Sequence, residues 1–211
     1  MSAPRICPDV LAIGAADNDL LDSPLPVNKE RQFNIVKTPL ASAWVLEPRI
    51  FRDERGEFFK TYHHDFFTDI GLPFAPKEEF FSVSRKGVIR GMHFQLPPFH
   101  LQKLVYCISG CVLDVVLDIK KDSPTFGNYY STELSSDNRK MLFACRGIAH
   151  GFLVLSSSAT MVYKTDCVYA PDHDAGIKWD SFGFDWPCAK PVLSNRDQGH
   201  PELKDFGSPF V

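Results

Sequence analysis

The chain has 211 residues, of which 44% are hydrophobic, and a formal net charge of −3 from 23 Lys and Arg against 26 Asp and Glu. This length supports one domain with a full hydrophobic core and is short for two. The charge balance excludes a global basic field for nucleic acid, so any anionic ligand must be bound by local groups. Apolar runs are too short to span a bilayer and no signal-type segment is recognisable, so we expect a cytoplasmic protein that binds neither membrane nor nucleic acid.

Six cysteines lie mostly alone within apolar segments: Cys7, Cys107, Cys111, Cys145, Cys167 and Cys188. They show neither a CxxC pair nor a Cys/His spacing typical of zinc. We interpret them as buried, reduced thiols.

Residues 1–33 differ in composition from the rest of the chain. They contain prolines, acidic residues and small residues without a sustained period of 2 or 3.6. We therefore expect a loosely ordered N-terminal extension at 1–33, followed by a single domain at 34–211.

Short β-type segments separated by turn residues fill most of that domain. In chain order they are 34–40, 43–51, 57–63, 80–84, 88–94, 103–110, 111–119, 128–134, 140–147, 150–155 and 160–169. This regular punctuation predicts an all-β sandwich or barrel. One short helix is expected at 64–70, and the Pro-rich tail after Trp186 is expected to be irregular.

Side-chain alternation indicates which residues share a face of a strand. Tyr163 and Tyr169 have the same parity, so both can point into one cavity if the strand is regular between them. Arg90 and His93 are three residues apart and would face opposite ways in a regular strand. A site that uses both requires a β-bulge at Gly91, since glycine permits the local bend and the close backbone approach.

Six segments resemble, in order and spacing, the dTDP-4-dehydrorhamnose 3,5-epimerase family. They are DERGEFFKTY (53–62), VIRGMHFQ (88–95), QKLVYCISGCVLDVVLDIKKDSPTFG (102–127), GIAHGFLVLS (147–156), VYKTDCVYAP (162–171) and LSNRD (193–197). The resemblance covers nearly all of the chain from about Asn34. It implies a jelly-roll fold of the cupin type, a homodimer whose N-terminal strands complete the partner's sheet, and neither a metal nor an organic cofactor.

Inverting a carbon next to a ketone needs a base, a cation for the enolate oxygen and an acid on the opposite face. His93 fits the base, because a neutral imidazole titrates near neutrality. The resemblance implies Asp197 as its carboxylate partner, Lys103 as the cation and Tyr163 as the proton donor. The predicted enzyme is an epimerase that inverts C3, C5 or both in a nucleoside-diphosphate 4-keto-6-deoxy sugar, for a surface polysaccharide or a glycosylated product.

The resemblance also implies a set of substrate contacts. Arg55, reaching across from the neighbouring subunit, Arg90 and His150 match residues that bind the nucleotide sugar, and guanidinium groups suit phosphate oxygens. Tyr169 matches an aromatic residue that stacks on the nucleotide base. An acidic and a basic ligand contact are matched by Asp174 and Arg196.

Two positions depart from the family pattern. Lys60 stands where dTDP-specific members usually carry glutamate, and Glu78-Glu79-Phe80 replaces a segment that typically reads Gln-Asp-Asn. Either Lys60 and Glu78 form a compensating pair, or Glu78 accepts a hydrogen bond from an exocyclic amino group of cytosine or guanine. In a third interpretation neither residue touches the ligand. The nucleotide therefore stays open among dTDP, CDP and GDP.

Many cupin-type barrels bind a metal through clustered histidines and a carboxylate. Around His93 no second histidine follows two positions away, and His150 stands alone in its strand, which disfavours a metal-dependent oxygenase. Asp114 and Asp118 resemble a paired-carboxylate site, but we expect them either to be structural or to support a residue that contacts the substrate, because better acid–base candidates exist.

A non-catalytic nucleotide-sugar-binding module is the alternative from another class. Such a module would keep Arg90 and Tyr169 and lose the base or the acid. The joint presence of His93, Lys103, Tyr163 and Asp197 favours the enzyme.

Overall fold

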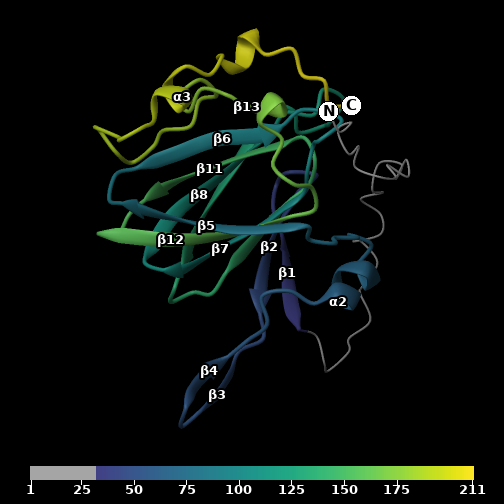
Figure 1. The fold of residues 1–211 in the computed structure, drawn as a ribbon, viewed down its shortest axis with the longest axis vertical. Helices are drawn as coiled ribbons and strands as arrows, with labels where there is room; N and C mark the ends of the chain where they lie inside the picture. Colours follow the sequence, from purple (N-terminus) through teal and green to yellow (C-terminus); the bar gives the residue numbers. More distant parts are fainter. Residues whose placement is uncertain (1–31) are drawn as a thin grey trace, which may run out of the picture.

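Antiparallel strands are the main regular elements of the described part of the chain, residues 32–211, in the computed structural model (Figure 1). One sheet has six strands in the spatial order β1 (Phe33–Lys37), β2 (Ala43–Pro48), β10 (Met141–Ala144), β7 (Lys103–Ser109), β12 (Ser158–Thr165) and β5 (Glu78–Arg85). A second sheet has five, in the order β13 (Asp174–Gly176), β6 (Ile89–Gln95), β11 (Ile148–Val154), β8 (Cys111–Asp118) and β9 (Tyr129–Ser135). The predicted all-β jelly roll of the cupin type is confirmed.

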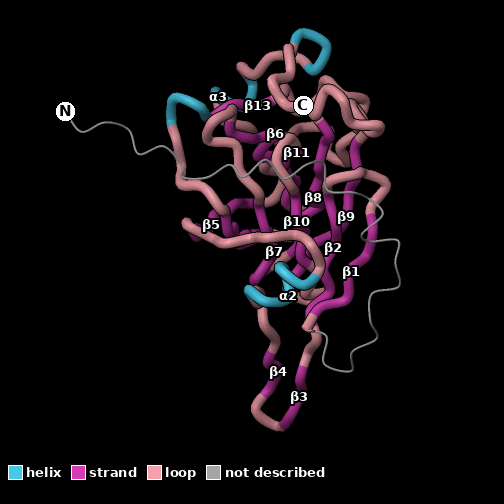
Figure 2. The backbone as a smooth tube through the Cα atoms, turned by 90° about the vertical axis from the view of Figure 1, so that its right-hand side faces the viewer, coloured by secondary structure: helices cyan, strands magenta, loops and turns pink. Residues whose placement is uncertain are grey.

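A separate hairpin, β3 (Phe51–Asp53) and β4 (Gly56–Phe58), extends away from both sheets. Figure 2 shows it at the end of the molecule opposite α3 (Asn195–Gln198) and β13. The predicted strand 43–51 is thus divided, because Pro48 cannot donate to a ladder and ends β2. The predicted segment 57–63 keeps strand geometry only as far as Phe58.

Helical structure is sparse. The helix expected at 64–70 is confirmed as α2 (His64–Asp69), where the side chain of His63 accepts a hydrogen bond from the Phe66 N–H at 3.3 Å and caps the first turn. The tail after Trp186 is largely irregular, as predicted, with α3 and the 3-10 turn η2 (Leu203–Asp205). A second 3-10 turn, η1 (Pro171–His173), precedes β13. Among residues 32–211 there is no helix long and apolar enough to cross a membrane.

A loosely ordered extension was predicted for residues 1–33. Residues 1–31 lie outside the described residues, and residues 32 and 33 lie within them. Phe33, the last residue assigned to the extension, is described: it begins β1 and is buried. The folded unit therefore includes this side chain, which packs against Phe66 of α2 with ring centroids 4.8 Å apart.

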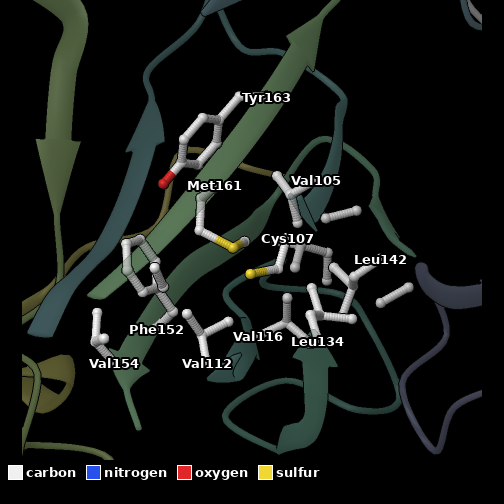
Figure 3. Close-up of a cluster of buried hydrophobic side chains, with 14 of the residues drawn as sticks. Val105, Cys107, Val112, Val116, Leu134, Leu142, Phe152, Val154, Met161 and Tyr163 are labelled. Atoms are coloured by element: carbon white, nitrogen blue, oxygen red, sulfur yellow. The ribbon is translucent and has the colours of Figure 1, made fainter. Parts of the chain in front are cut away.

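Alternating apolar side chains from the two sheets form the central core. Val105, Val112, Val116 and Phe152 are buried there, and Tyr163 lies at one end of the cluster (Figure 3). Such burial contributes about 1.5–3 kcal/mol for each large apolar side chain. The core therefore holds the two sheets at a fixed separation and leaves its end available for polar groups.

Two further clusters cover the outer faces of the sheets. Helix α2 and the following turn pack Phe67 and Phe74 against Phe143 of the six-stranded sheet. The C-terminal tail, which arches beside β6 in Figure 1, packs Phe210 against Phe94 of the five-stranded sheet. The tail is thus an integral layer, and it brings α3 to the edge of the site.

A bulge interrupts β6 at the predicted position. His150 pairs with His93 and Phe152 pairs with Arg90, so two residues of β6 oppose one residue of β11. Gly91 has φ +146°, and a Cβ built there would lie 2.5 Å from the Cα of Gly151. Glycine is therefore required both by conformation and by the neighbouring strand.

We predict that Gly91→Ala destabilises the fold more than a glycine substitution that meets only conformational strain. The control is Gly127→Ala, where φ is +77° and an added Cβ meets no atom within 4 Å. Gly91→Ala is expected to lose about 1–3 kcal/mol more unfolding free energy, because overpacking adds to the strain. Urea unfolding measures the difference, and equal losses for the two variants would contradict the steric role of Gly91.

Candidate active site

A cavity of about 250 Å³ opens between the two sheets, beyond the end of the central core. Most residues predicted for the site line this cavity: Glu78, Arg90, His93, Lys103, His150, Tyr163, Tyr169, Asp174 and Arg196. They come from strands of both sheets and from the segment that follows β12. The bulge at Gly91 is what allows both Arg90 and His93 to reach it.

His93 is hydrogen-bonded to the buried carboxylate of Asp197. The distance from His93 Nε2 to Asp197 Oδ1 is 2.8 Å, and Asp197 Oδ2 accepts the N–H of Gly91 at 3.3 Å. Ser194 caps α3 by accepting the Asp197 N–H, which holds this residue at the start of the helix. A neutral imidazole that donates Nε2–H to Asp197 keeps its lone pair on Nδ1.

The protonation states of this pair suit a base. Burial lowers the pKa of His93 and outweighs the opposing effect of Asp197. Burial acts to raise the pKa of Asp197, but the hydrogen bonds from His93 and from the Gly91 N–H prevail and lower it. Near neutral pH the imidazole is therefore uncharged and able to take a proton, and its carboxylate partner is ionised.

Lys103 contacts the main chain of the proposed base, His93. Its Nζ donates a hydrogen bond to the main-chain carbonyl of His93 at 2.9 Å. Burial lowers the pKa of Lys103 to about 8, against the attraction of Asp174 and Asp114. The ammonium is thus mostly protonated at pH 7 and sits in a desolvated position, where it can stabilise a developing negative charge strongly.

Tyr163 approaches the cavity from the sheet opposite to His93. It lies on β12 of the six-stranded sheet, and His93 lies on β6 of the five-stranded sheet. The Tyr163 hydroxyl is 3.1 Å from Ser82 Oγ, and burial raises the pKa of the phenol. A protonated phenol and a neutral imidazole therefore enclose the cavity from two sides.

A second buried histidine–carboxylate pair lies deeper in the cavity. His150 Nε2 is 2.7 Å from Asp114 Oδ2, and both side chains are almost fully buried. Burial raises the pKa of Asp114, and His150 and Lys103 oppose that rise. Asp114 was expected to be structural or to support another residue, and its hydrogen bond with His150 fits the second of these roles. Asp118 instead binds loop groups, the Lys120 N–H and the hydroxyls of Ser123 and Thr125.

The outer part of the cavity gathers groups for a polar ligand. The Tyr169 N–H donates to Glu78 Oε2 at 2.7 Å, and the Tyr169 hydroxyl donates to Asp174 Oδ2 at 3.2 Å. Arg90 Nε donates to Ser84 Oγ at 2.9 Å. Tyr169 lines the cavity together with Tyr163, as predicted, but the reason given was wrong. Strand β12 ends at Thr165, so the following loop and not strand parity places Tyr169.

Arg196 lies between Asp174, in the outer part of the cavity, and the proposed base His93. Its guanidinium forms an ion pair with Asp174, and one nitrogen, Nη2, lies 2.7 Å from His93 Nε2. Nε2 can either donate a hydrogen bond to the Asp197 carboxylate or accept one from this guanidinium, and donation to the buried, ionised carboxylate is the stronger interaction. Arg196 therefore acts on His93 mainly as a nearby positive charge that lowers the pKa of the imidazole.

His200 is a neighbour that the sequence did not indicate. Its ring packs edge-on against His93 at 5.8 Å, and its Nε2 lies 3.8 Å from Asp197 Oδ1. His93, Asp197 and His200 offer three ligand atoms within 4.8 Å of one another, a set that could hold a metal ion by ligand type. The fit is poor, because the Arg196 guanidinium already brings a positive charge to His93 Nε2.

Two predicted residues lie away from the cavity within this chain. Arg55 is at the exposed tip of the β3–β4 hairpin and pairs with Asp53 at 2.5 Å. Lys60 follows the hairpin and does not line the cavity. Within one chain, the described residues Lys60 and Glu78 form no ion pair with each other, so the compensating pair considered from the sequence is not formed there. Glu78 itself faces the cavity.

The residues missed by the sequence share one property: each acts through a partner that is distant along the chain. Asp114 meets His150, the ring of His200 packs against His93, and Ser82 meets Tyr163 across the β5–β12 ladder. A charged residue in a strand that is otherwise apolar on both faces was the available signal for Asp114.

Acid and base groups that face each other across a cupin-type barrel define an enzyme of proton transfer at carbon. A family model described as dTDP-4-dehydrorhamnose 3,5-epimerase matches residues 37–205. The dTDP-4-dehydrorhamnose 3,5-epimerase of Shigella flexneri is 41% identical over 167 residues, which are 78% of this chain and 92% of that protein. The chain belongs to the dTDP-4-dehydrorhamnose 3,5-epimerase family, whose members are isomerases acting on carbohydrates.

Solved structures agree with this assignment. The dTDP-4-dehydrorhamnose 3,5-epimerase of Elizabethkingia anophelis NUHP1 matches with a TM-score of 0.79 and 38% identity, covering 83% of this chain and 98% of that one. The dTDP-6-deoxy-D-glucose-3,5-epimerase of Legionella pneumophila Philadelphia 1, solved in complex with dTDP-4-keto-L-rhamnose, has the same TM-score, 34% identity, and coverage of 83% and 95%.

Proposed function

We propose that the cavity inverts C3, C5 or both of a dTDP-linked 4-keto-6-deoxy sugar, in the synthesis of a deoxysugar for surface polysaccharide or another glycosylated product. The observation that carries the proposal is the opposition of His93 and Tyr163 from two facing sheets, with the Lys103 ammonium beside the base. The Legionella relative, solved with dTDP-4-keto-L-rhamnose, supports this substrate class.

The reaction follows from the charges of these groups. His93 removes the proton from the carbon next to the ketone, and the electron pair of the broken C–H bond moves onto the C4 oxygen as an enolate. Lys103 stabilises that oxygen. Tyr163 then transfers its hydroxyl proton to the carbon from the opposite face, which leaves a phenolate that solvent reprotonates. Asp197 orients the imidazole and stabilises the imidazolium that forms.

Binding of the nucleotide diphosphate is assigned to the polar rim. Arg90 and Arg196 supply guanidinium donors for phosphate oxygens there, Arg196 next to Asp174, and His150 contacts the substrate deeper in the cavity. Tyr169 is 55% exposed, so one face of its ring is available to stack on a base.

A non-catalytic nucleotide-sugar-binding module is not favoured. Relatives about 40% identical over most of the chain are named as epimerases. A binder would also have no need for a buried carboxylate that holds a neutral imidazole, or for a phenol opposite to it.

Exchange in deuterated water tests the proposal. With dTDP-4-dehydro-6-deoxyglucose, the wild type is expected to place deuterium at C3, C5 or both, located by NMR, together with inversion. His93→Ala is expected to abolish exchange, because no base remains. Tyr163→Phe is expected to keep exchange and to lose inversion by roughly 10²-fold or more, the usual size of general-acid catalysis.

A His93→Ala protein that exchanged as fast as the wild type would overturn the choice of base. Absence of exchange at both carbons in the wild type, with dTDP-, CDP- and GDP-linked substrates alike, would overturn the enzyme itself.

We infer that Glu78 reads the nucleotide base. Its carboxylate lines the cavity and accepts the N–H of Tyr169, the residue proposed to stack on the base. A carboxylate there accepts hydrogen bonds from a base, either from a ring N–H or from the exocyclic amino group of cytosine or guanine. We thus assign recognition of the nucleotide base to the Glu78 side chain and to the loop that carries Tyr169.

Glu78→Gln is expected to change the ratio of kcat/KM values among the dTDP-, CDP- and GDP-linked substrates by roughly tenfold, since the amide replaces an acceptor by a donor and still accepts from Tyr169. Glu79→Gln is the matched control, because Glu79 pairs with Lys164 on the other face of β5. An unchanged ratio in Glu78→Gln would show that this side chain does not contact the base.

We also propose that two copies form a homodimer in which N-terminal strands complete the partner's sheet and Arg55 reaches the neighbouring cavity. Support comes from the projecting β3–β4 hairpin, whose Phe51 and Phe58 are 44% and 62% exposed (Figure 2). Within residues 32–211, strand β1 also lies at the edge of the six-stranded sheet, the position from which a sheet can be extended. Sedimentation velocity is expected to give twice the chain mass of 23.8 kDa, and a monomer at micromolar concentration would contradict the dimer.

A cytoplasmic location is proposed as well. The thiols of Cys107, Cys111, Cys145 and Cys188 are free, as in a reducing compartment. Recovery of the protein outside the cytoplasmic fraction of its own cells would contradict this.

A further inference from the structure

An aromatic side chain on the edge strand β5 lies flat against the proposed acid. Phe80 is 45% exposed yet lines the cavity, and its ring stacks on Tyr163 with centroids 4.7 Å apart and planes 12° apart. The two residues are direct partners in the β5–β12 ladder. The cavity side of this half-exposed phenylalanine therefore covers one face of the Tyr163 phenol ring.

Ser82 acts on the same phenol from the same strand. It lies two residues after Phe80, therefore on the same face of β5, and its hydroxyl is 3.1 Å from the Tyr163 hydroxyl. On the other side the Tyr163 ring meets His150 edge-on, with centroids 6.2 Å apart. The ring face and the hydroxyl of Tyr163 are thus each held by one residue of β5.

Because β5 lies at the edge of its sheet, the contacts of Phe80 and Ser82 with Tyr163 are separate from the hydrophobic core. Among the strands of residues 32–211, β5 pairs only with β12, and the side chains of Phe81 and Val83 on its other face are 70% and 59% exposed. Neither Phe80 nor Ser82 belongs to the buried clusters that hold the sheets together. Their contacts with Tyr163 are therefore not needed to complete the hydrophobic core.

We propose that Phe80 and Ser82 are positioning residues that hold the Tyr163 hydroxyl in line with the reacting carbon, and so decide how often an enolate is inverted. This inference rests on the proposed role of Tyr163 as the acid. Once His93 has taken the proton, the enolate has two fates. His93 returns a proton to the original face, which restores the substrate, or Tyr163 delivers its O–H proton to the opposite face, which gives the epimer.

The balance of the inverting step shows what each residue contributes. The phenol O–H bond breaks, a C–H bond forms at the enolate carbon, and the O–H electron pair stays on the phenolate oxygen. Ser82 can donate its hydroxyl hydrogen to that oxygen as the charge develops. Phe80 prevents the ring from swinging toward the exposed edge, so the hydroxyl stays at reacting distance.

Deuterated water separates the two fates. Deuterium in recovered, unepimerised dTDP-4-dehydro-6-deoxyglucose reports return to the original face after the protonated His93 has exchanged its proton with the solvent, and deuterium in the epimer reports inversion. Phe80→Ala and Ser82→Ala are each expected to raise the ratio of return to inversion by about tenfold or more, because they weaken general-acid delivery and leave His93 in place. Phe80→Tyr is expected to restore the wild-type ratio, since it keeps a stacked ring.

Phe81→Ala is the matched control, with the same substitution one residue along and on the opposite face of β5. It is expected to keep the wild-type ratio. Thermal unfolding of all variants is compared, and if Phe80→Ala does not fold, Phe80→Leu, which keeps apolar bulk and loses the flat stack, is measured with Ser82→Ala.

The ratio is insensitive to a general loss of active protein, because both fates require the same folded site. A wild-type ratio in Phe80→Ala or Phe80→Leu and in Ser82→Ala would overturn the inference, and so would an equal fall of exchange and inversion in these variants. Failure of the wild type to exchange or to invert at all would instead overturn the proposed function.

Discussion

The buried carboxylate of Asp197 is the contact on which the arrangement of the site depends. It accepts the N–H of Gly91 with one oxygen and meets the imidazole of His93 with the other. A buried carboxylate is costly unless it is hydrogen-bonded, so the same contacts that satisfy Asp197 also fix the base and the bulge that presents it. The C-terminal tail provides Asp197 through α3, which explains why a mostly irregular segment is packed firmly against the five-stranded sheet.

Because Asp197 fixes His93 on the five-stranded sheet, the two sheets carry different groups of the site. The five-stranded sheet carries the base and the deep His150–Asp114 pair, and the six-stranded sheet carries the acid and its neighbours on β5. The apolar core between the sheets keeps them at a fixed separation. Stereochemical inversion needs groups on two faces of one carbon, and two packed sheets are a simple way to hold them there.

Period-2 alternation and turn residues were enough to predict most of the strands and the short helix, because these depend on local backbone preferences, and they predicted the bulge once Arg90 and His93 were assumed to serve one site. The spacing of Arg90 and His93 predicted Gly91 as the bulge, since glycine is what a close approach to Gly151 demands. What alternation could not show was which strands become neighbours. The pairing of Asp114 with His150 and the stack of Phe80 on Tyr163 both depend on sheet order.

Loops were the weakest part of the prediction for a related reason. Tyr169 reaches the cavity because the chain leaves β12 at Thr165 and is then held by Glu78 and Asp174, contacts that no strand parity contains. Pro48 ends β2, and the chain then forms a hairpin that places Arg55 on the surface, away from the cavity of the same chain.

The protonation state of His93 tests the central claim most directly. Nitrogen-15 NMR of the imidazole, assigned by the loss of its signals in His93→Ala, reports which ring nitrogen carries the proton. At pH 7 we expect Nε2 protonated, Nδ1 with the lone pair, and a pKa below the ordinary histidine value, since burial disfavours the charged ring more than Asp197 favours it. A ring that carries protons on both nitrogens at pH 7, or only on Nδ1, would contradict the assignment of His93 as a base held by Asp197.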